Sequence, residues 1–258
     1  MKNMKIALIQ FDTRWEDKNN NLAAVSNKIK NLKEKVDLVV LPEMFTTGFT
    51  MNPAKVTEQE EELTLKMLQN LAKEQDLAIV GSWATEEHEK YYNRLYFILP
   101  DGSYKTYNKR HLFTLVGEEK VYHAGEDKLI VSYKGWNICP LICYDLRFPV
   151  YSRIVNQNYD LLLYVASWPD RRIYAWDSLL KARAIENMSY VVAVNRCGID
   201  PNGLAYSGHS QAIDYMGNYL VEPLINDQIK IIELEKESLQ KAREKFAFLN
   251  DADAFELK

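Results

Sequence analysis

The sequence predicts an α/β fold, a four-layer α-β-β-α sandwich in which two mixed β-sheets lie between outer helices. Three observations support this prediction. Apolar strands alternate with amphipathic helices over residues 5–83 and again over residues 150–195, as in βαβ units with right-handed crossovers. Hairpin signals interrupt this alternation and add antiparallel strands. No Pro-, Gly- or Ser-rich linker divides the chain, so we expect one domain over residues 1–258.

The first of these regions reads as β-α-β-α-β. Residues 5–11 form an apolar run that predicts a buried strand, and a helix is expected over residues 20–36. The apolar side chains of this helix recur every three or four positions, which places them on one face. They are Leu22, Val25, Ile29, Leu32 and Val36. A strand at residues 38–41, a helix at 58–75 and a strand at 77–83 complete the pattern.

Two hairpins are expected in the middle of the chain. Asp101 and Gly102 lie between apolar and aromatic runs at residues 93–99 and 103–107, and Asp-Gly in that setting is a strong hairpin signal. A second hairpin is expected to turn at residues 134–135. Its strands are expected at residues 129–133 and 136–143.

The remaining sequence returns to alternating helices and strands. We expect a short helix at residues 150–156, a strand at 160–167, a long helix at 173–188 and a strand at 190–195. A Gly-rich loop follows at residues 197–208, then a hairpin turning at 216–218, a strand at 228–234 and a helix at 236–246.

The composition favours a small-molecule partner. With 47% hydrophobic and 26% charged residues the chain can bury a sizeable core, and its formal net charge is -4. That charge gives no general attraction to nucleic acid or to an anionic membrane, both of which call for basic surface. Three cysteines without a CxxC pair and four scattered histidines indicate neither a disulfide scaffold nor a zinc site. We expect no metal and no cofactor.

The N-terminal apolar run is too short for a signal segment. No apolar run approaches the roughly 18 residues of a membrane span. These two observations predict a soluble protein of a reducing compartment, the cytoplasm.

One cysteine lies where a nucleophile would be presented. Cys143 ends the apolar run 137–143, directly before a polar turn, and ligands of α/β sheets bind beyond the carboxyl ends of strands. Cys139, inside the same run, and Cys197, at the start of a loop, are more typical of cysteines that act as small buried hydrophobes.

A thiol needs a base or a nearby cation to become a competent nucleophile. Glu43 and Lys109 each end an apolar or aromatic run in the same way as Cys143, and the three together predict a hydrolytic site. Taken singly, Glu43 is equally typical of a helix-capping or surface carboxylate. Lys109, followed by Arg110 and His111, is equally typical of a solvated turn.

Three segments resemble the signatures of the nitrilase (carbon-nitrogen hydrolase) superfamily, in the same order. They are LPEMFTTGF at residues 41–49, YNKRHLF at 107–113 and LICYDLRFP at 141–149. The resemblance is closest to the omega-amidase branch. It extends to YVASWP at residues 164–169 and ARAIEN at 182–187, and it spans residues 5–246.

The resemblance implies the role of each catalytic residue. Glu43 is the general base, Lys109 stabilises the oxyanion, and Cys143 attacks the substrate carbonyl to form a thioester. A second glutamate is implied after the lysine; we assign it to Glu118, although the adjacent Glu119 is an alternative. With Lys109, the backbone N–H of Tyr144 is the expected oxyanion donor, because an amide needs its developing negative charge held.

The resemblance also implies a class of substrate. Omega-amidases hydrolyse monoamides of dicarboxylic 2-oxo acids, such as 2-oxoglutaramate and 2-oxosuccinamate. Arg147 and Arg172 are the candidates for holding the substrate carboxylate, with Arg172 favoured over its neighbour Arg171. Structural salt bridges are the alternative for these arginines.

Three aromatic residues flank the signatures and are expected in the pocket wall. They are Phe45, Phe113 and Trp168. Aromatic side chains beside strands are also common in plain core. As in the family, a homodimer or larger homo-oligomer is expected.

Three other functions compete with this interpretation. The nearest is another superfamily branch: a nitrilase, an N-carbamoyl amidase or an amidase for deaminated glutathione. A second is a Cys-His hydrolase that uses His111 or His209. The third is a noncatalytic binding module that keeps the fold, which the complete set of Glu43, Lys109 and Cys143 disfavours.

Overall fold

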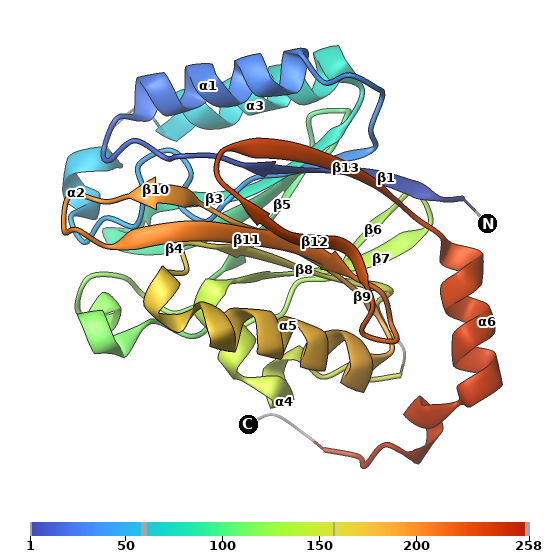
Figure 1. The fold of residues 1–258 in the computed structure, drawn as a ribbon. Coiled ribbons are helices and arrows are strands. Elements are labelled where there is room, and N and C mark those ends of the chain that lie inside the picture. Colours follow the sequence, from blue (N-terminus) through green and yellow to red (C-terminus); the bar gives the residue numbers. More distant parts are fainter. Residues whose placement is uncertain (1, 58–60, 157, 256–258) are drawn as a thin grey trace.

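In the computed structural model, which describes residues 2–57, 61–156 and 158–255, two mixed sheets form the centre of the molecule (Figure 1). The first sheet has six strands in the order β13-β1-β2-β3-β4-β5. They are β1 (Met4–Gln10), β2 (Leu38–Val40), β3 (Ala78–Glu87), β4 (Lys90–Ile98), β5 (Tyr104–Asn108) and β13 (Gln228–Leu234). The β1, β2 and β3 strands are parallel, and the other pairings are antiparallel.

The second sheet has seven strands, in the order β10-β11-β9-β8-β7-β6 with β12 also paired to β11. They are β6 (Val131–Tyr133), β7 (Trp136–Ile142), β8 (Leu161–Ala166), β9 (Tyr190–Asn195), β10 (Cys197–Ile199), β11 (Ala205–Ile213) and β12 (Tyr219–Ile225). The central strands β7, β8 and β9 are parallel. Both sheets are therefore mixed, as predicted.

Helices cover the outer face of each sheet. The α1 helix (Lys18–Lys30) and the α3 helix (Glu61–Gln75) lie over the first sheet, and α5 (Ile173–Asn187) lies over the second (Figure 1). The short helices α2 (Pro53–Val56) and α4 (Pro149–Ser152) lie in loops, and α6 (Lys236–Phe246) packs beside the sheets. The prediction of a four-layer α-β-β-α sandwich is confirmed. No helix within the described ranges has the length and apolar character needed to cross a membrane.

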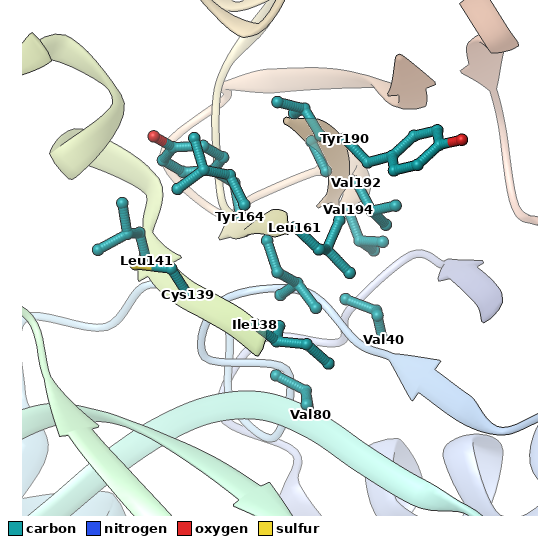
Figure 2. Close-up of a cluster of buried hydrophobic side chains, with 14 of the residues drawn as sticks. Val40, Val80, Ile138, Cys139, Leu141, Leu161, Tyr164, Tyr190, Val192 and Val194 are labelled. Atoms are coloured by element: carbon teal, nitrogen blue, oxygen red, sulfur yellow. The ribbon is translucent and has the colours of Figure 1, made fainter. Parts of the chain in front are cut away.

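The space between the sheets is filled by apolar side chains. Val40 and Val80 of the first sheet point toward Ile138 of the second (Figure 2). All three are fully buried. At roughly 1.5–3 kcal/mol for each fully buried side chain of this size, such contacts fix the two sheets against each other. The ends of strands in different sheets are therefore held in a defined relative position.

Four details differ from the predictions. The α1 helix ends at Lys30, six residues before the expected boundary, and α4 ends at Ser152 instead of residue 156. A hairpin joins β3 to β4, and its turn residues His88 and Glu89 both have positive φ. The segment 197–208, expected as a loop, contributes β10 and the start of β11. Residues 58–60 of the second expected helix lie outside the described residues.

Several 3₁₀ turns complete the structure. They are η1 (Thr114–Val116), η2 (Glu118–Lys120), η3 (Cys143–Arg147), η4 (Asp170–Arg172) and η5 (Phe248–Asp251). The first four follow strand ends and carry residues of the candidate site.

Candidate active site

The candidate site forms where strand ends from both sheets meet. Lys109 directly follows β5, Cys143 directly follows β7, and Ser167 directly follows β8, while Glu43 lies just beyond β2. The β5 strand is antiparallel to β4, which is antiparallel to β3, so β5 runs in the same direction as β2 and β3. The site thus uses the carboxyl ends of strands, as expected for α/β sheets.

Glu43 is fully buried and held by three donors. Its Oε1 accepts hydrogen bonds from Lys109 Nζ at 2.9 Å and from Asn93 Nδ2 at 2.7 Å. Its Oε2 accepts one from the backbone N–H of Ser167 at 2.8 Å, and the Ser167 hydroxyl donates to the Glu43 carbonyl at 3.1 Å. Burial of a carboxylate requires such partners, and here they also fix its orientation.

Lys109 is buried between two glutamates. Its Nζ donates to Glu43 and also to both carboxylate oxygens of Glu118, at 3.1 and 3.0 Å. Burial by itself lowers the pKa of this lysine, but the carboxylates of Glu118 and Glu43 raise the pKa of Lys109 above its ordinary value. The ammonium therefore stays charged at neutral pH and is unsuited to act as a base.

Of the two adjacent glutamates, only Glu118 reaches the lysine. Glu118 is buried and Glu119 is exposed. Burial raises the pKa of Glu118, although the charge of Lys109 opposes this shift. The backbone N–H of Phe113 also donates to Glu118. This glutamate therefore connects the lysine to the loop that carries Phe113.

Cys143 lies at the turn between β7 and η3. Its φ is +44°, a conformation that is strained for a residue with a side chain and recurs at functional sites. It is 9% exposed and lines the pocket, whereas Cys139 and Cys197 are 0% and 4% exposed and do not. Burial first, and then the negative charge of Glu43, raise the pKa of the Cys143 thiol well above its usual value, while Lys109 opposes this shift.

Asp145 joins the turn that carries Cys143 to the segment that carries Lys109. It is fully buried, and it accepts hydrogen bonds from the backbone N–H of Ile142 at 2.9 Å and the hydroxyl of Tyr107 at 2.8 Å. It also accepts from the backbone N–H of His111 at 3.0 Å, and it contacts His111 Nδ1 at 2.8 Å. Because these partners belong to β7 and to residues 107–111, the aspartate fixes the relative position of Cys143 and Lys109.

A pocket with about 460 Å³ of empty space opens onto the thiol. Its lining comprises Glu43, Phe49, Lys109, Phe113, Val116, Cys143, Tyr144, Arg147, Ser167, Trp168, Pro169, Arg172 and Tyr206. The sequence-predicted residues Phe113, Tyr144 and Trp168 are among them. Most of the wall is aromatic or apolar, which is typical of a small-molecule site with a few oriented polar groups.

Phe45 does not line the pocket, so this part of the sequence prediction is wrong. Its backbone N–H donates to the Ser82 carbonyl at 3.1 Å, and its ring packs edge-to-face against Trp83 with centroids 5.8 Å apart. These contacts hold Phe45 in the core beside β3. The wall position is taken by Phe49, whose ring lies 5.2 Å from the ammonium of Lys109.

Two arginines face the pocket without a carboxylate partner. The Arg147 guanidinium lies 4.9 Å from the Trp168 ring, and the Arg172 guanidinium lies 4.9 Å from the Phe113 ring. Neither forms an ion pair with any part of the chain that the structure describes. Burial first, and then the charges of Arg171 and Arg147, lower the pKa of Arg172. Arg171 is exposed and does not line the pocket.

The histidines proposed for a Cys-His hydrolase lie elsewhere. The His111 ring bonds to Asp145 and stacks on Phe148 with centroids 3.7 Å apart. The His209 Nδ1 contacts Asp177 Oδ2 at 2.9 Å. No histidine lines the pocket within the described ranges, which disfavours a histidine base for Cys143.

Sequence reasoning missed several residues of this site. Asn93 and Ser167 orient Glu43, Asp145 holds the turn that carries Cys143, and Phe49 and Tyr206 complete the wall. Of these, Phe49 lies in the segment 41–49, Asp145 lies two positions from Cys143, and Ser167 ends a predicted strand, so these three carried a positional signal. Asn93 and Tyr206 reach the site through contacts between distant parts of the chain.

A sandwich of this kind, with a buried glutamate, lysine and cysteine gathered at its strand ends, defines the class of protein. Residues 5–244 match the carbon-nitrogen hydrolase family. The chain belongs to that family, and it is an enzyme that hydrolyses a carbon–nitrogen bond.

Similar proteins cover the whole chain. The sequence is 41% identical over 256 residues to the omega-amidase YafV of Yersinia enterocolitica, covering 99% of each chain. It is 32% identical to a 2-oxoglutaramate amidase of Bacillus subtilis, covering 95% of this chain and 96% of the relative. The crystal structure of a CN-hydrolase superfamily protein from Xanthomonas campestris, with an arsenic adduct in its active site, has a TM-score of 0.97 and 39% identity and covers 100% of both chains.

Proposed function

We propose that the protein is an amidase that hydrolyses the terminal amide of small anionic 2-oxo acid monoamides, 2-oxoglutaramate and 2-oxosuccinamate. The observation that carries this proposal is the pair of guanidiniums, Arg147 and Arg172, that face the pocket beside Cys143 without a carboxylate partner among the described residues. Relatives named omega-amidase and 2-oxoglutaramate amidase support it.

The charges of the site explain why an anionic substrate needs these arginines. Glu43 and Glu118 surround the single ammonium of Lys109, so with both glutamates ionised the buried cluster is net negative. An anionic substrate would be repelled from it at short range. Two guanidiniums at the pocket wall offset this repulsion, and a guanidinium binds a carboxylate bidentately.

The first half-reaction transfers the acyl group to Cys143. The thiol starts protonated because its pKa is raised, so Glu43 takes the proton as the sulfur–carbon bond forms. The oxyanion forms beside Lys109 and the backbone N–H of Tyr144, and a single such donor can contribute roughly 3–4 kcal/mol. Glu43 then gives its proton to the nitrogen as the carbon–nitrogen bond breaks. Ammonia leaves, and a thioester remains.

The second half-reaction restores the enzyme. Glu43 takes a proton from water as the water oxygen attacks the thioester carbonyl. It returns this proton to the sulfur as the carbon–sulfur bond breaks, which releases the 2-oxo acid. One carboxylate serves both half-reactions because each returns its proton.

Substrate profiling separates this proposal from the other superfamily branches. Rates of ammonia release should be compared for 2-oxoglutaramate, for a neutral amide of the same length, for a nitrile and for an N-carbamoyl amino acid. We expect the anionic 2-oxo amide to have the highest kcat/KM. Rapid nitrile turnover with negligible 2-oxoglutaramate hydrolysis would contradict the proposal.

Arg172→Leu tests the proposed carboxylate contact. We expect KM for 2-oxoglutaramate to rise about 10- to 100-fold, because a charge-assisted hydrogen bond is worth roughly 1.5–3 kcal/mol. The rate with a neutral amide should change far less. Arg171→Leu is the matched control, because Arg171 is exposed and outside the pocket. Equal losses with the neutral and the anionic amide would exclude a carboxylate contact for Arg172.

Glu118→Gln tests the second glutamate. The change removes one of the two carboxylates that hold the Lys109 ammonium, and we expect kcat to fall about 100-fold. Glu119→Gln, at the exposed neighbouring position, should stay close to wild type. Steady-state kinetics of the pair provides the measurement. Similar losses in both variants would mean that loop structure, and not the lysine contact, carries the effect.

The proposal includes a cytoplasmic location and a homodimer or larger homo-oligomer. Three free cysteines and the absence of a disulfide among the described residues are compatible with a reducing compartment. Exposed apolar side chains on α5, Tyr174 at 84% and Ile185 at 53%, are compatible with a subunit contact. Light scattering of the purified protein tests the assembly.

A further inference from the structure

The three donors around Glu43 determine which of its lone pairs stays free. Each carboxylate oxygen has about two acceptor positions. Oε1 accepts from Lys109 Nζ at 2.9 Å and from Asn93 Nδ2 at 2.7 Å, so both of its positions are filled. Oε2 accepts only from the Ser167 N–H, at 2.8 Å, among the contacts that the structure describes. One position on Oε2 is left for a proton.

The pocket lies on the side of that oxygen. Ser167, whose N–H bonds to Oε2, lines the pocket together with Glu43 and Cys143. Asn93, whose amide bonds to Oε1, does not line it. The free position of the carboxylate therefore belongs to the oxygen held from the pocket side, where the thiol proton must be moved.

Asn93 reaches both charged partners of the nucleophile. It is fully buried in β4, its side chain donates to Glu43, and its backbone carbonyl accepts from the Lys109 N–H at 3.0 Å. A carboxylate oxygen only accepts, so the amide nitrogen must face Glu43. The amide oxygen then points away, and it has no hydrogen-bond partner among the described residues. The buried amide thus tolerates an unpaired oxygen while its nitrogen contacts the base.

We propose that Asn93 is a positioning residue for this reaction. Its amide occupies the second acceptor position of Glu43 Oε1, so that only Oε2 can take the thiol proton and return it to the leaving nitrogen. The inference rests on the proposed role of Glu43 as the base. It does not depend on which amide is the substrate. Asn93 does not line the pocket, and it acts through Glu43 and Lys109.

Asn93→Ala is the first test. Without the amide donor, the ionised form of Glu43 is less favoured and its proton can settle on Oε1. We expect kcat to fall about 10- to 100-fold with KM within about threefold. Because the base must be ionised, the acidic limb of the pH–rate profile should move to higher pH. Asn93→Asp keeps the shape and places a second carboxylate against Glu43, so it should move the limb further in the same direction.

A second readout avoids the choice of substrate. The rate at which methyl methanethiosulfonate labels Cys143 should be followed by mass spectrometry across pH for wild type and both variants. The same upward displacement of the acidic limb is expected. Two results together would separate the two proposals. If the labelling profile of the variants is displaced but wild type does not hydrolyse 2-oxoglutaramate, the substrate assignment fails and the role of Asn93 stands.

Asn187→Ala is the matched control for loss of a buried asparagine. Asn187 is also fully buried, but its side chain bonds to the Ile154 N–H and the Arg183 carbonyl, outside the pocket. The Asn187→Ala substitution should lower the melting temperature and leave the pH profiles of turnover and of labelling unchanged. If Asn93→Ala behaves like this control, with lower stability and a wild-type acidic limb, the inference is overturned. An acidic limb unchanged in both Asn93 variants would overturn it as well.

Discussion

Replacing Cys143 by alanine is expected to reduce ammonia release from 2-oxoglutaramate by at least about 10⁴-fold, because the acyl group then has no nucleophile to receive it. Removal of the sulfur leaves the pocket, the arginines and Lys109 in place, so substrate binding should persist. Single-turnover kinetics and calorimetric binding measure the two effects separately. Unchanged turnover in this variant would exclude Cys143 as the nucleophile and, with it, the thioester mechanism.

The other two cysteines provide the controls. Burial raises the pKa of Cys139 to about 12 and the pKa of Cys197 to about 11, and neither lines the pocket. We expect Cys197→Ala to keep most of the activity. Cys139→Ala should act mainly on stability, since its side chain belongs to the core. After incubation with a reactive substrate analogue, mass spectrometry should find the adduct on Cys143 alone.

The parts of the fold that could be predicted are those with local signals. The Asp101-Gly102 turn and the alternation of strands with amphipathic helices were sufficient to predict two mixed sheets between helices. The β3–β4 turn could not be found in the same way. Its residues, His88 and Glu89, both adopt positive φ, a conformation usually signalled by Gly, Asn or Asp. Here the long pairing of the two strands outweighs the local preference.

The candidate catalytic residues could be predicted because each follows a strand. Glu43, Lys109 and Cys143 all follow apolar or aromatic runs, and the family resemblance assigned their roles. Asn93 is inside β4, where a polar residue in an alternating strand carries no special signal. Its contact with Glu43 joins residues fifty positions apart. Such a contact depends on how β3 and β4 are placed in the sheet, which sequence spacing alone does not determine.

The pocket wall shows why position in the sequence alone does not determine which side chain faces the pocket. Phe45 and Phe49 both lie in the segment that follows Glu43, and either could face the substrate. Met44 and Gly48 adopt positive φ, at +45° and +72°, and these reversals direct Phe45 into the core and Phe49 to the pocket. At Gly48 an added Cβ would lie 3.1 Å from Trp15, so a side chain there would add a close contact to the strain of the positive φ.

Glu43→Gln is expected to lower kcat by about 10³-fold or more, because the amide cannot take the thiol proton or return it to the leaving nitrogen. The change preserves size, and its carbonyl oxygen can still accept from Lys109 and Asn93. His111→Ala and His209→Ala should cause much smaller losses, because neither ring lines the pocket. A histidine variant with a loss as large as that of Glu43→Gln would favour a Cys-His mechanism instead.

The same Glu43→Gln variant distinguishes loss of the base from collapse of the site. After burial, the negative charge of Glu43 is the largest cause that raises the pKa of Cys143, and the charge of Lys109 opposes it. Removing the carboxylate charge therefore lowers the pKa of the thiol. Burial still raises that pKa, so labelling of Cys143 by methyl methanethiosulfonate at neutral pH should fall together with turnover, whereas at high pH, where the thiol ionises without a base, labelling should persist. If labelling is lost at high pH as well, Glu43 acts mainly by holding Lys109 in place, because a more acidic thiol in an intact site must react once it is ionised.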